Sequence, residues 1–226
     1  MSDLIKLSTL EMQIEQFKLA GAAKTPPEIR ALRKAETEKL IQTGIAEQSF
    51  HSGEHAPDFT LPDANGESVT LSSLLTAGPV VLTFYRGEWC PYCNLALRAY
   101  QAVLPQIKAL GATLVAVSPQ QPDFSRAMVT KADLTFPVLS DVGNHVARRY
   151  RLVFTLPETL RPISANLPRF NGDESWELPL PGTFVVGQAG VIHAAFVDAD
   201  YTKRMEPAAI LAALEKLQPN RVHPTP

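Results

Sequence analysis

The sequence predicts an α/β fold with a mixed central sheet flanked by helices, and three observations support this. Residues 80–84 form a continuous apolar run with the composition of a strand buried on both faces. A helical stretch and a second apolar run at 113–117 follow; with short connections, this order requires a parallel crossover. Two further β-rich runs, 183–186 and 191–197, are joined by a glycine-containing turn and predict an antiparallel hairpin.

Composition narrows the class of protein. The chain has 226 residues, 45% of them hydrophobic, and a net charge of −2, which are the values of an ordinary soluble protein. No basic surplus indicates nucleic acid or an anionic membrane, and the apolar runs are too short to span a bilayer. The first residues lack the basic and apolar segments of a signal peptide, so we expect a cytoplasmic protein.

Residues 1–54 are predicted to be an N-terminal helical extension. Leu7, Leu10, Ile14 and Phe17 form one apolar stripe, and a Thr-Pro-Pro sequence at 25–27 separates it from a second helix ending near residue 44. Two interpretations are open. The helices pack onto their own domain, or they clasp a second subunit and form a homodimer.

A single domain is predicted over residues 55–218, followed by a tail at 219–226. Between the Asn65-Gly66 turn, which joins two short strands, and the final hairpin, the pattern predicts a series of elements. These are a strand at 80–84, a helix at 93–110 interrupted near Pro105, a strand at 113–117, a helix at 123–131, a strand at 136–139 and a helix at 142–150. A closing helix is predicted at 207–217.

Residues 153–180 carry four prolines and an Asn171-Gly172 turn, and are predicted to be an ordered insertion before the last hairpin. Its aromatic residues Phe170 and Trp176 are expected to cover the edge of the sheet, because isolated aromatic residues usually pack.

Both cysteines of the chain lie in the stretch Trp89-Cys90-Pro91-Tyr92-Cys93, between a buried strand and a helix. Two cysteines at this spacing form a reversible dithiol/disulfide, because the enclosed loop is small and a helix N-terminus stabilises the thiolate. Cys90, at the helix start, is the expected nucleophile, and Cys93, one turn inside, is expected to resolve the mixed disulfide. Pro91 fixes φ at the helix opening, and Trp89 and Tyr92 can form an apolar rim for a partner.

Arg86 precedes this stretch, and its role is open: it lowers a thiol pKa, binds a carboxylate or forms a salt bridge. A zinc site is disfavoured, because zinc needs four ligands and the chain has no second CxxC and only scattered histidines. We therefore expect neither a metal nor a bound organic cofactor.

The predicted order of elements, with CxxC at the first strand-to-helix junction, resembles the thioredoxin fold. The flanking sequence resembles peroxiredoxins of the AhpC/TSA family over residues 55–217. The residues that carry the resemblance are Ala56-Pro57-Asp58-Phe59-Thr60-Leu61, Phe84-Tyr85 and Thr183-Phe184-Val185-Val186. The Cys-Pro-Tyr-Cys core is instead similar to that of glutaredoxins.

The resemblance implies a thiol-dependent oxidoreductase that is reduced by a thioredoxin, glutaredoxin or glutathione system and acts on a disulfide or a peroxide. In the leading interpretation, Cys90 attacks a partner disulfide and Cys93 displaces it. In the alternative, the family's Pro, Thr and peroxidatic Cys positions fall on Arg86, Cys90 and Cys93, so Cys93 becomes the sulfenic acid and Cys90 resolves it. A third interpretation is a redox-sensing interaction module without turnover.

Two further segments are singled out by the resemblance. Pro181, Gly182 and Thr183 stand where thioredoxins place a cis-proline beside the dithiol, so they are candidate substrate-binding residues. The second arginine of peroxiredoxins would fall near Pro181 and is absent from that position. A polar cluster, Asp-x-Asp-Tyr-x-x-Arg-x-Glu-Pro at 198–207, is similar to a motif of the peroxiredoxin-like group, and a hairpin-to-helix capping network explains it equally well.

Overall fold

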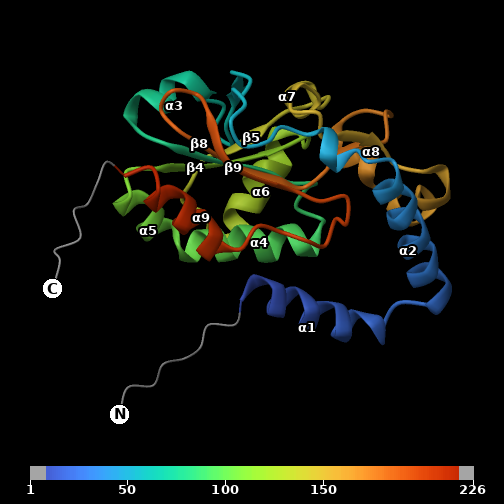
Figure 1. Ribbon diagram of the computed structural model, residues 1–226. Coiled ribbons are helices and arrows are strands. Elements are labelled where there is room, and N and C mark those ends of the chain that lie inside the picture. The colour runs from blue at the N-terminus through green and yellow to red at the C-terminus, as the bar shows by residue number, and fades with distance from the viewer. Residues whose placement is uncertain (1–8, 219–226) are drawn as a thin grey trace, which may run out of the picture.

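The computed structural model describes residues 9–218, and its centre is a five-stranded mixed sheet of order β5-β4-β3-β8-β9 (Figure 1). The central strands β3 and β4 are parallel and joined by a helical crossover, as the sequence predicts, and β8 and β9 form the predicted antiparallel hairpin. The strand bounds are β3 Val80–Phe84, β4 Thr113–Ser118, β5 Val138–Ser140, β8 Gly182–Val186 and β9 Ile192–Val197.

Helices cover both faces of this sheet. On one face, buried apolar residues of four helices pack against the strands: α4 (Pro91–Ala102), α5 (Leu104–Ala109), α6 (Pro122–Ala132) and α9 (Pro207–Glu215). The opposite face is covered by α3 (Leu71–Ala77) and α7 (His145–Arg149). Every residue of β3 is buried, which explains its uninterrupted apolar sequence.

The long helix predicted after the dithiol is interrupted, as expected. It ends at Ala102, and α5 begins at Leu104 with Pro105 in its first turn. Proline has no N–H to continue a helical ladder but is tolerated at a helix start, so the break falls just before it. The short helix α3 begins at Leu71, directly after β2 (Ser68–Thr70), and has no counterpart among the elements that the sequence predicts.

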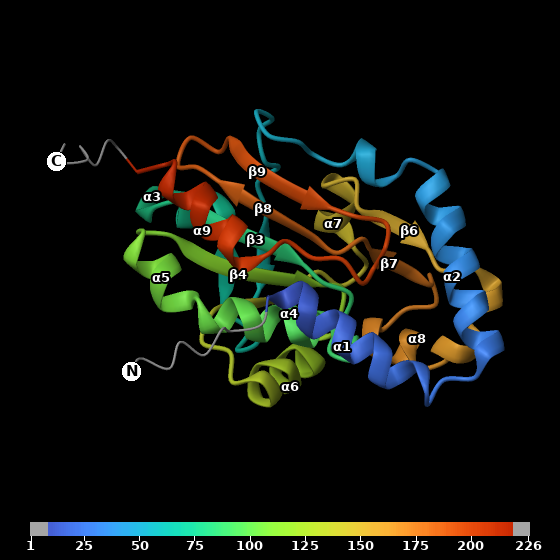
Figure 2. The same cartoon turned by 60° about the horizontal axis from the view of Figure 1, so that its bottom comes forward.

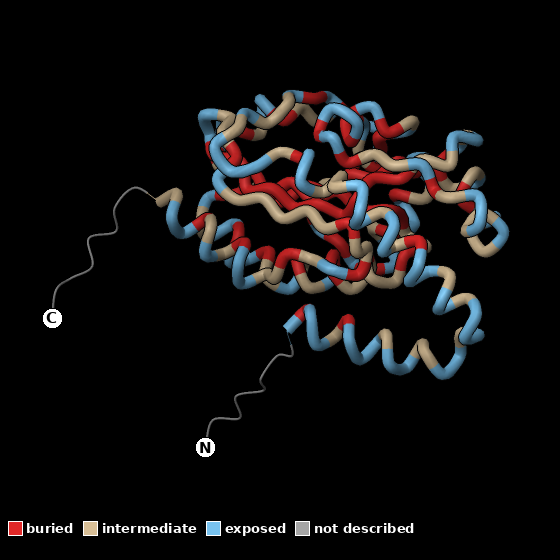
Figure 3. The backbone as a smooth tube through the Cα atoms, turned by 45° about the vertical axis from the view of Figure 1, so that its right-hand side comes forward, coloured by how far each residue is buried: buried red, intermediate tan, exposed pale blue. Residues whose placement is uncertain are grey.

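The N-terminal extension folds back onto its own chain. Helix α1 (Leu10–Ala22) begins at Thr9, whose hydroxyl accepts a hydrogen bond from the Met12 amide at 3.2 Å, and it lies along α4 (Figure 2). Helix α2 (Pro27–Gln42) contacts the short 3₁₀ helix η2 (Glu158–Leu160), and η1 (Ala46–Gln48) follows it. Much of both α1 and α2 stays exposed while the sheet is mostly buried (Figure 3). Leu7 lies outside the described residues.

Two small sheets complete the fold. The predicted turn at Asn65-Gly66 joins β1 (Thr60–Pro62) to β2 (Ser68–Thr70) in an antiparallel pair. Between residues 153 and 180, β6 pairs with β7, with short helices between them. The bounds there are β6 Val153–Thr155, η3 Pro162–Ser164, α8 Leu167–Asn171 and β7 Glu177–Pro179. Within residues 9–218, no helix has both the length and the apolar character needed to cross a bilayer.

Candidate active site

The dithiol lies where β3 leads into α4. Cys90 is the N-cap residue of α4, with extended backbone angles, and Pro91 occupies the first helical position, to which its fixed φ is suited. Cys93 lies in the first turn of the helix. Both are free thiols, and both are buried, with 1% of Cys90 and 0% of Cys93 exposed.

Cys93 is surrounded by groups that favour its thiolate. The Arg204 guanidinium donates a hydrogen bond from Nη2 to Cys93 Sγ at 3.1 Å. Burial alone would raise the pKa of Cys93. Hydrogen bonds from the Cys90 thiol and the Arg86 backbone, together with the charges of Arg204 and Arg86, outweigh burial and lower that pKa to about 5.

Cys90 is held in the opposite protonation state. Burial raises its pKa well above the usual value, and the neighbouring Cys93 adds to that rise through the shared hydrogen bond and its charge. The two opposite shifts therefore favour a thiolate at Cys93 and a thiol at Cys90. This direction is opposite to our expectation that Cys90, at the helix start, is the thiolate; which cysteine attacks first stays a prediction. The hydrogen bond that Cys90 donates to Cys93, and the charges and hydrogen bonds of Arg204 and Arg86 around Cys93, all favour the thiolate at Cys93.

Arg86 packs between two aromatic rings rather than beside a carboxylate. Its guanidinium carbon lies 4.9 Å from the centre of the Trp89 ring and 4.6 Å from that of Tyr201. Among the described residues Arg86 forms no ion pair, and its buried Nε has no hydrogen-bond partner. Of its three candidate roles, the geometry favours lowering a thiol pKa over a structural salt bridge.

Arg204 is fixed by its own loop. Its Nη1 donates to the carbonyl oxygens of Tyr201 at 2.7 Å and Lys203 at 2.6 Å. The Tyr100 hydroxyl, on α4, donates to the carbonyl of Met205 at 2.8 Å and ties the loop to the helix that carries the cysteines. The guanidinium is therefore preorganised beside Cys93 before any substrate arrives.

Sequence reasoning did not place Arg204 in the site. It noted that the second arginine of peroxiredoxins is absent near Pro181; the structure supplies a second guanidinium from the segment after β9 instead. The signal was present in the polar cluster at 198–207. Local turns explain part of that cluster: the carboxylates of Asp198 and Asp200 accept backbone amides two residues on, at 2.8 Å from Asp200 and 3.0 Å from Thr202. The predicted capping of α9 is not seen, because its N-cap residue Glu206 makes no side-chain cap hydrogen bond.

The predicted aromatic rim exists, but the chain's own residues cover it. The Tyr92 ring meets Tyr201 at 5.7 Å and Phe17 of α1 at 5.5 Å, measured between ring centroids. Trp89 lies 6.5 Å from Phe170. Our expectation for Phe170 therefore needs correction: it packs beside the dithiol loop. Trp176 packs within the 153–180 segment, under the guanidinium of Arg161 at 5.3 Å.

Pro181, Gly182 and Thr183 are buried at the start of β8. The Leu180–Pro181 bond is trans. The Thr183 hydroxyl lies 2.9 Å from that of Thr83 and 3.5 Å from that of Tyr100, below the dithiol helix. A substrate-binding role for these three residues stays a prediction.

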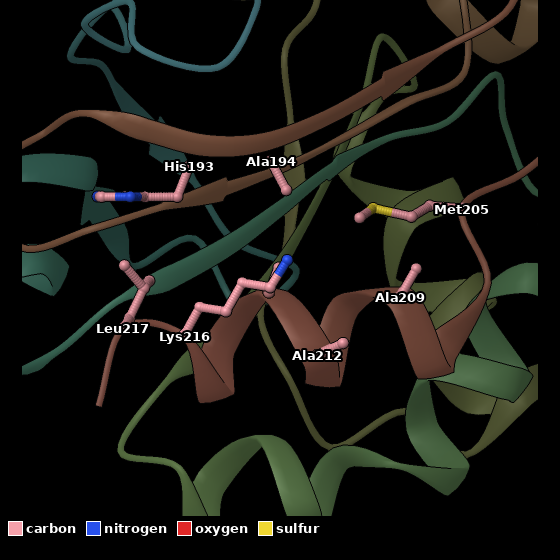
Figure 4. Close-up of a pocket in the computed structure, with 8 residues that line it drawn as sticks. His193, Ala194, Met205, Ala209, Ala212, Lys216 and Leu217 are labelled. Atoms are coloured by element: carbon pink, nitrogen blue, oxygen red, sulfur yellow. The ribbon is translucent and has the colours of Figure 1, made fainter. Parts of the chain in front are cut away.

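The structure also has a groove that lies apart from the dithiol. A groove of about 440 Å³ runs between β9 and α9, and neither cysteine lines it (Figure 4). Its lining is mostly apolar and consists of His193, Ala194, Met205, Ala209, Ala212, Ala213, Lys216 and Leu217. Within residues 9–218, no three His, Cys, Asp or Glu side chains are grouped so that they could hold a metal ion.

The fold and site define a thioredoxin-fold protein with a buried dithiol. The family model described as the AhpC/TSA family matches residues 52–195, and the chain belongs to that family. Crystal structures of peroxidoxin BcpB from Mycobacterium tuberculosis and peroxiredoxin Q from Xanthomonas campestris share the fold. The first has a TM-score of 0.61 and 22% identity over 75% of this chain and 99% of that one. For the second, the TM-score is 0.56, with 20% identity over 70% and 90%.

Curated relatives share part of the sequence. A chloroplastic peroxiredoxin Q from Triticum aestivum is 31% identical over 137 residues, which cover 61% of this chain and 63% of that protein. The thiol-disulfide oxidoreductase ResA from Bacillus cereus is 28% identical over 108 residues, or 47% of this chain and 61% of ResA. The chain thus spans less than two thirds of the length of either relative.

Proposed function

We propose that this protein is a thiol-dependent peroxidase in which Cys93 is the peroxidatic cysteine and Cys90 resolves it. One observation carries the proposal: Arg204 Nη2 lies 3.1 Å from Cys93 Sγ and favours the thiolate there, while Cys90 stays protonated. A thiolate is the nucleophile that peroxide reduction needs. Membership of the AhpC/TSA family and the match to a protein named peroxiredoxin Q support the same assignment.

The chemistry balances with these two side chains. The Cys93 thiolate attacks the terminal oxygen of a hydroperoxide, the O–O bond breaks, and the leaving alkoxide or hydroxide takes a proton from solvent. Cys93 is then a sulfenic acid. The Cys90 sulfur attacks it, water leaves, and a Cys90–Cys93 disulfide forms. Two equivalents of an external thiol reduce that disulfide, restore both cysteines and are themselves oxidised to a disulfide.

Arg86 is suited to assist the first step. Its buried Nε is a donor without a partner among the described residues, and its charge favours the Cys93 thiolate. A peroxide oxygen that gains negative charge as the O–O bond breaks needs such a donor. Arg86 and Arg204 together would supply the positive charge beside the thiolate and the hydrogen-bond donor for the peroxide oxygen that the two arginines of peroxiredoxins would provide.

Thiol–disulfide exchange is the second candidate function. The similarity to a protein named thiol-disulfide oxidoreductase ResA and the CxxC spacing favour it. Here too the dithiol cycles between two states, but the substrate is a disulfide. The preference for a thiolate at Cys93 weighs against Cys90 as the attacking group.

Hydrogen peroxide consumption by wild type, Cys90→Ser and Cys93→Ser separates the candidates. In a single turnover, we expect Cys90→Ser to keep the initial rate of wild type and to stop at a sulfenic acid that dimedone traps on Cys93. We expect Cys93→Ser to be inactive. Multiple turnovers with excess thiol require both cysteines. Negligible consumption by wild type, with rapid reduction of a low-molecular-weight disulfide, would replace the peroxidase assignment with exchange.

The physiological setting is part of the proposal. The reducing thiol would come from one of three systems, thioredoxin, glutaredoxin or glutathione, and the access that the fold allows to the dithiol decides between them. A pair of free thiols fits a cytoplasmic location. A homodimer through the N-terminal helices α1 and α2 stays a prediction. Sedimentation at several protein concentrations tests it: a mass that stays monomeric contradicts it.

A further inference from the structure

Helix α1 packs beside the helix that carries the dithiol. Leu10 and Ile14 are buried in the same apolar cluster as Cys90 and Cys93. One turn further along, the Phe17 ring stands edge-on to Tyr92, the residue between Pro91 and Cys93, with 5.5 Å between ring centroids. Figure 2 shows α1 running beside α4, the helix whose first turn contains the site.

The start of α1 is anchored beside the groups that hold Cys93. The Glu206 carboxylate accepts hydrogen bonds from the backbone amides of Leu10 at 3.1 Å and Glu11 at 2.7 Å. These are orphan donors of the first helical turn, where the positive end of the helix dipole favours a carboxylate. Glu206 lies two residues after Arg204, so one short segment holds both the guanidinium on Cys93 and the start of the covering helix.

Helix α1 is attached to the rest of the protein by few buried side chains. Of the thirteen residues of α1, Leu10 and Ile14 are buried, whereas Leu19 is 74% exposed and Phe17 is 41% exposed. Segments with few buried contacts are those that open locally at low free-energy cost. The helix is therefore suited to exclude large molecules from the site while remaining displaceable.

We propose that α1 is an intramolecular cover that restricts this dithiol to small hydroperoxides as oxidants and small thiols as reductants, and excludes disulfides and dithiols of folded proteins. The inference rests on the proposed function and adds the substrate and reductant class. Exchange requires the incoming sulfur to bond directly to Cys90 or Cys93, and both side chains are almost wholly buried. Hydrogen peroxide, with two heavy atoms, needs only a narrow path to such a sulfur, whereas a sulfur on a protein surface would bring a backbone into the place of α1.

The test compares reagents of two sizes on the full-length reduced protein. Each variant is alkylated with iodoacetamide and, separately, with a maleimide carrying a long polyethylene glycol chain, and its reaction with hydrogen peroxide is followed. Phe17→Ala and Glu206→Ala each remove one anchor of α1. Leu19→Ala is the matched control, because it changes an exposed position of the same helix.

We expect both anchor variants to react roughly three- to tenfold faster with the polymer reagent, the size expected when a helix cap or similar contact is lost. Their iodoacetamide rates, and those of Leu19→Ala with either reagent, should match wild type. In addition, glutathione should reduce the Cys90–Cys93 disulfide of wild type well, and reduced thioredoxin should do so efficiently only in the anchor variants.

Three outcomes would overturn the cover: an unchanged polymer rate in both anchor variants, equal acceleration of both reagents as in global unfolding, or efficient reduction of wild type by thioredoxin. The reaction with hydrogen peroxide distinguishes failure of the proposed peroxidase function from failure of the proposed cover. Selective polymer acceleration in a protein that consumes no peroxide would remove the proposed function and leave the cover standing. Normal peroxide consumption without size selection would remove the cover and leave the proposed function standing.

Discussion

Two chemically identical thiols, three residues apart, are pushed into different protonation states by their neighbours. Both are buried, and burial disfavours either thiolate. Cys93 receives hydrogen bonds from Arg204, from the Arg86 backbone and from Cys90, whereas Cys90 faces the negative charge of Cys93. When the pKa values of two paired groups diverge in this way, the divergence assigns their roles. The cysteine held as the thiolate attacks the substrate, and the protonated cysteine then forms the disulfide with it.

Arg204→Met should raise the pKa of Cys93. Removing an opposite charge in direct contact typically raises an acidic pKa by about 1 to 3, so at pH 6 the thiolate should fall from the predominant form to half of the molecules or fewer. The measurement is the pH dependence of iodoacetamide alkylation in the Cys90→Ser background, where the serine hydroxyl can still donate to Cys93. With Arg204 present, reactivity should fall as the pH drops through about 5.

Arg161→Met is the matched control for that experiment, because Arg161 packs on Trp176 in the 153–180 segment and does not contact either cysteine. Its alkylation profile should overlay that of the parent protein. If Arg204→Met also overlays it, Arg204 does not stabilise the thiolate, and the basis for Cys93 as the peroxidatic residue is lost.

At the scale of secondary structure, α4 is the element that joins the parts of the site. Its first turn carries Cys93, its third turn carries Tyr100, and α1 packs along its side. The Tyr100 hydroxyl reaches the carbonyl of Met205 and so holds the segment that bears Arg204. The position of a guanidinium that is remote in sequence is thus set by a tyrosine two helical turns from the thiolate.

Tyr100→Phe should therefore change the chemistry as well as the stability. Losing one buried hydroxyl hydrogen bond should cost about 1 kcal/mol in the free energy of unfolding. Tyr150→Phe is the control: its hydroxyl donates to the carbonyl of Pro57 at 2.9 Å on the other face of the sheet, and it should cost a similar amount. Only Tyr100→Phe should raise the pKa of Cys93 in the alkylation assay. Equal pH profiles for the two variants would show that the Arg204 loop does not depend on Tyr100.

At the scale of the whole molecule, sequence patterns predicted those features of the fold that depend on residues close together in the chain. The burial of β3, the break before Pro105 and the dithiol at the start of α4 all follow from short stretches of sequence. The protonation states could not be predicted in the same way, because the contact that decides them joins residues 111 positions apart. The packing of α1 over α4 could not be predicted either. An apolar stripe on α1 indicates that one face is buried, but not against which helix. Its link to Glu206 spans 196 positions.

The buried thiolate should also make the stability of the reduced protein depend on pH. The pKa of Cys93 is about 5 in the folded state, against a usual value of 9.0. Between these values the unfolded chain holds a proton that the folded protein does not, so the free energy of unfolding rises with pH. One such proton corresponds to a slope of at most about 1.4 kcal/mol per pH unit. The contribution is complete above the unfolded pKa and is lost as the pH falls through the folded one.

Urea denaturation at pH 6, 7 and 8 under reducing conditions measures this slope, with Cys93→Ala and Cys90→Ser beside wild type. Cys93→Ala lacks the titrating group and should show a shallower dependence, whereas Cys90→Ser should keep that of wild type. Wild type and Cys93→Ala have every other ionisable side chain in common, so the difference between their slopes isolates Cys93. Parallel lines for wild type and Cys93→Ala would mean that Cys93 is protonated in the folded protein at neutral pH, and the thiolate would then have to form only when substrate binds.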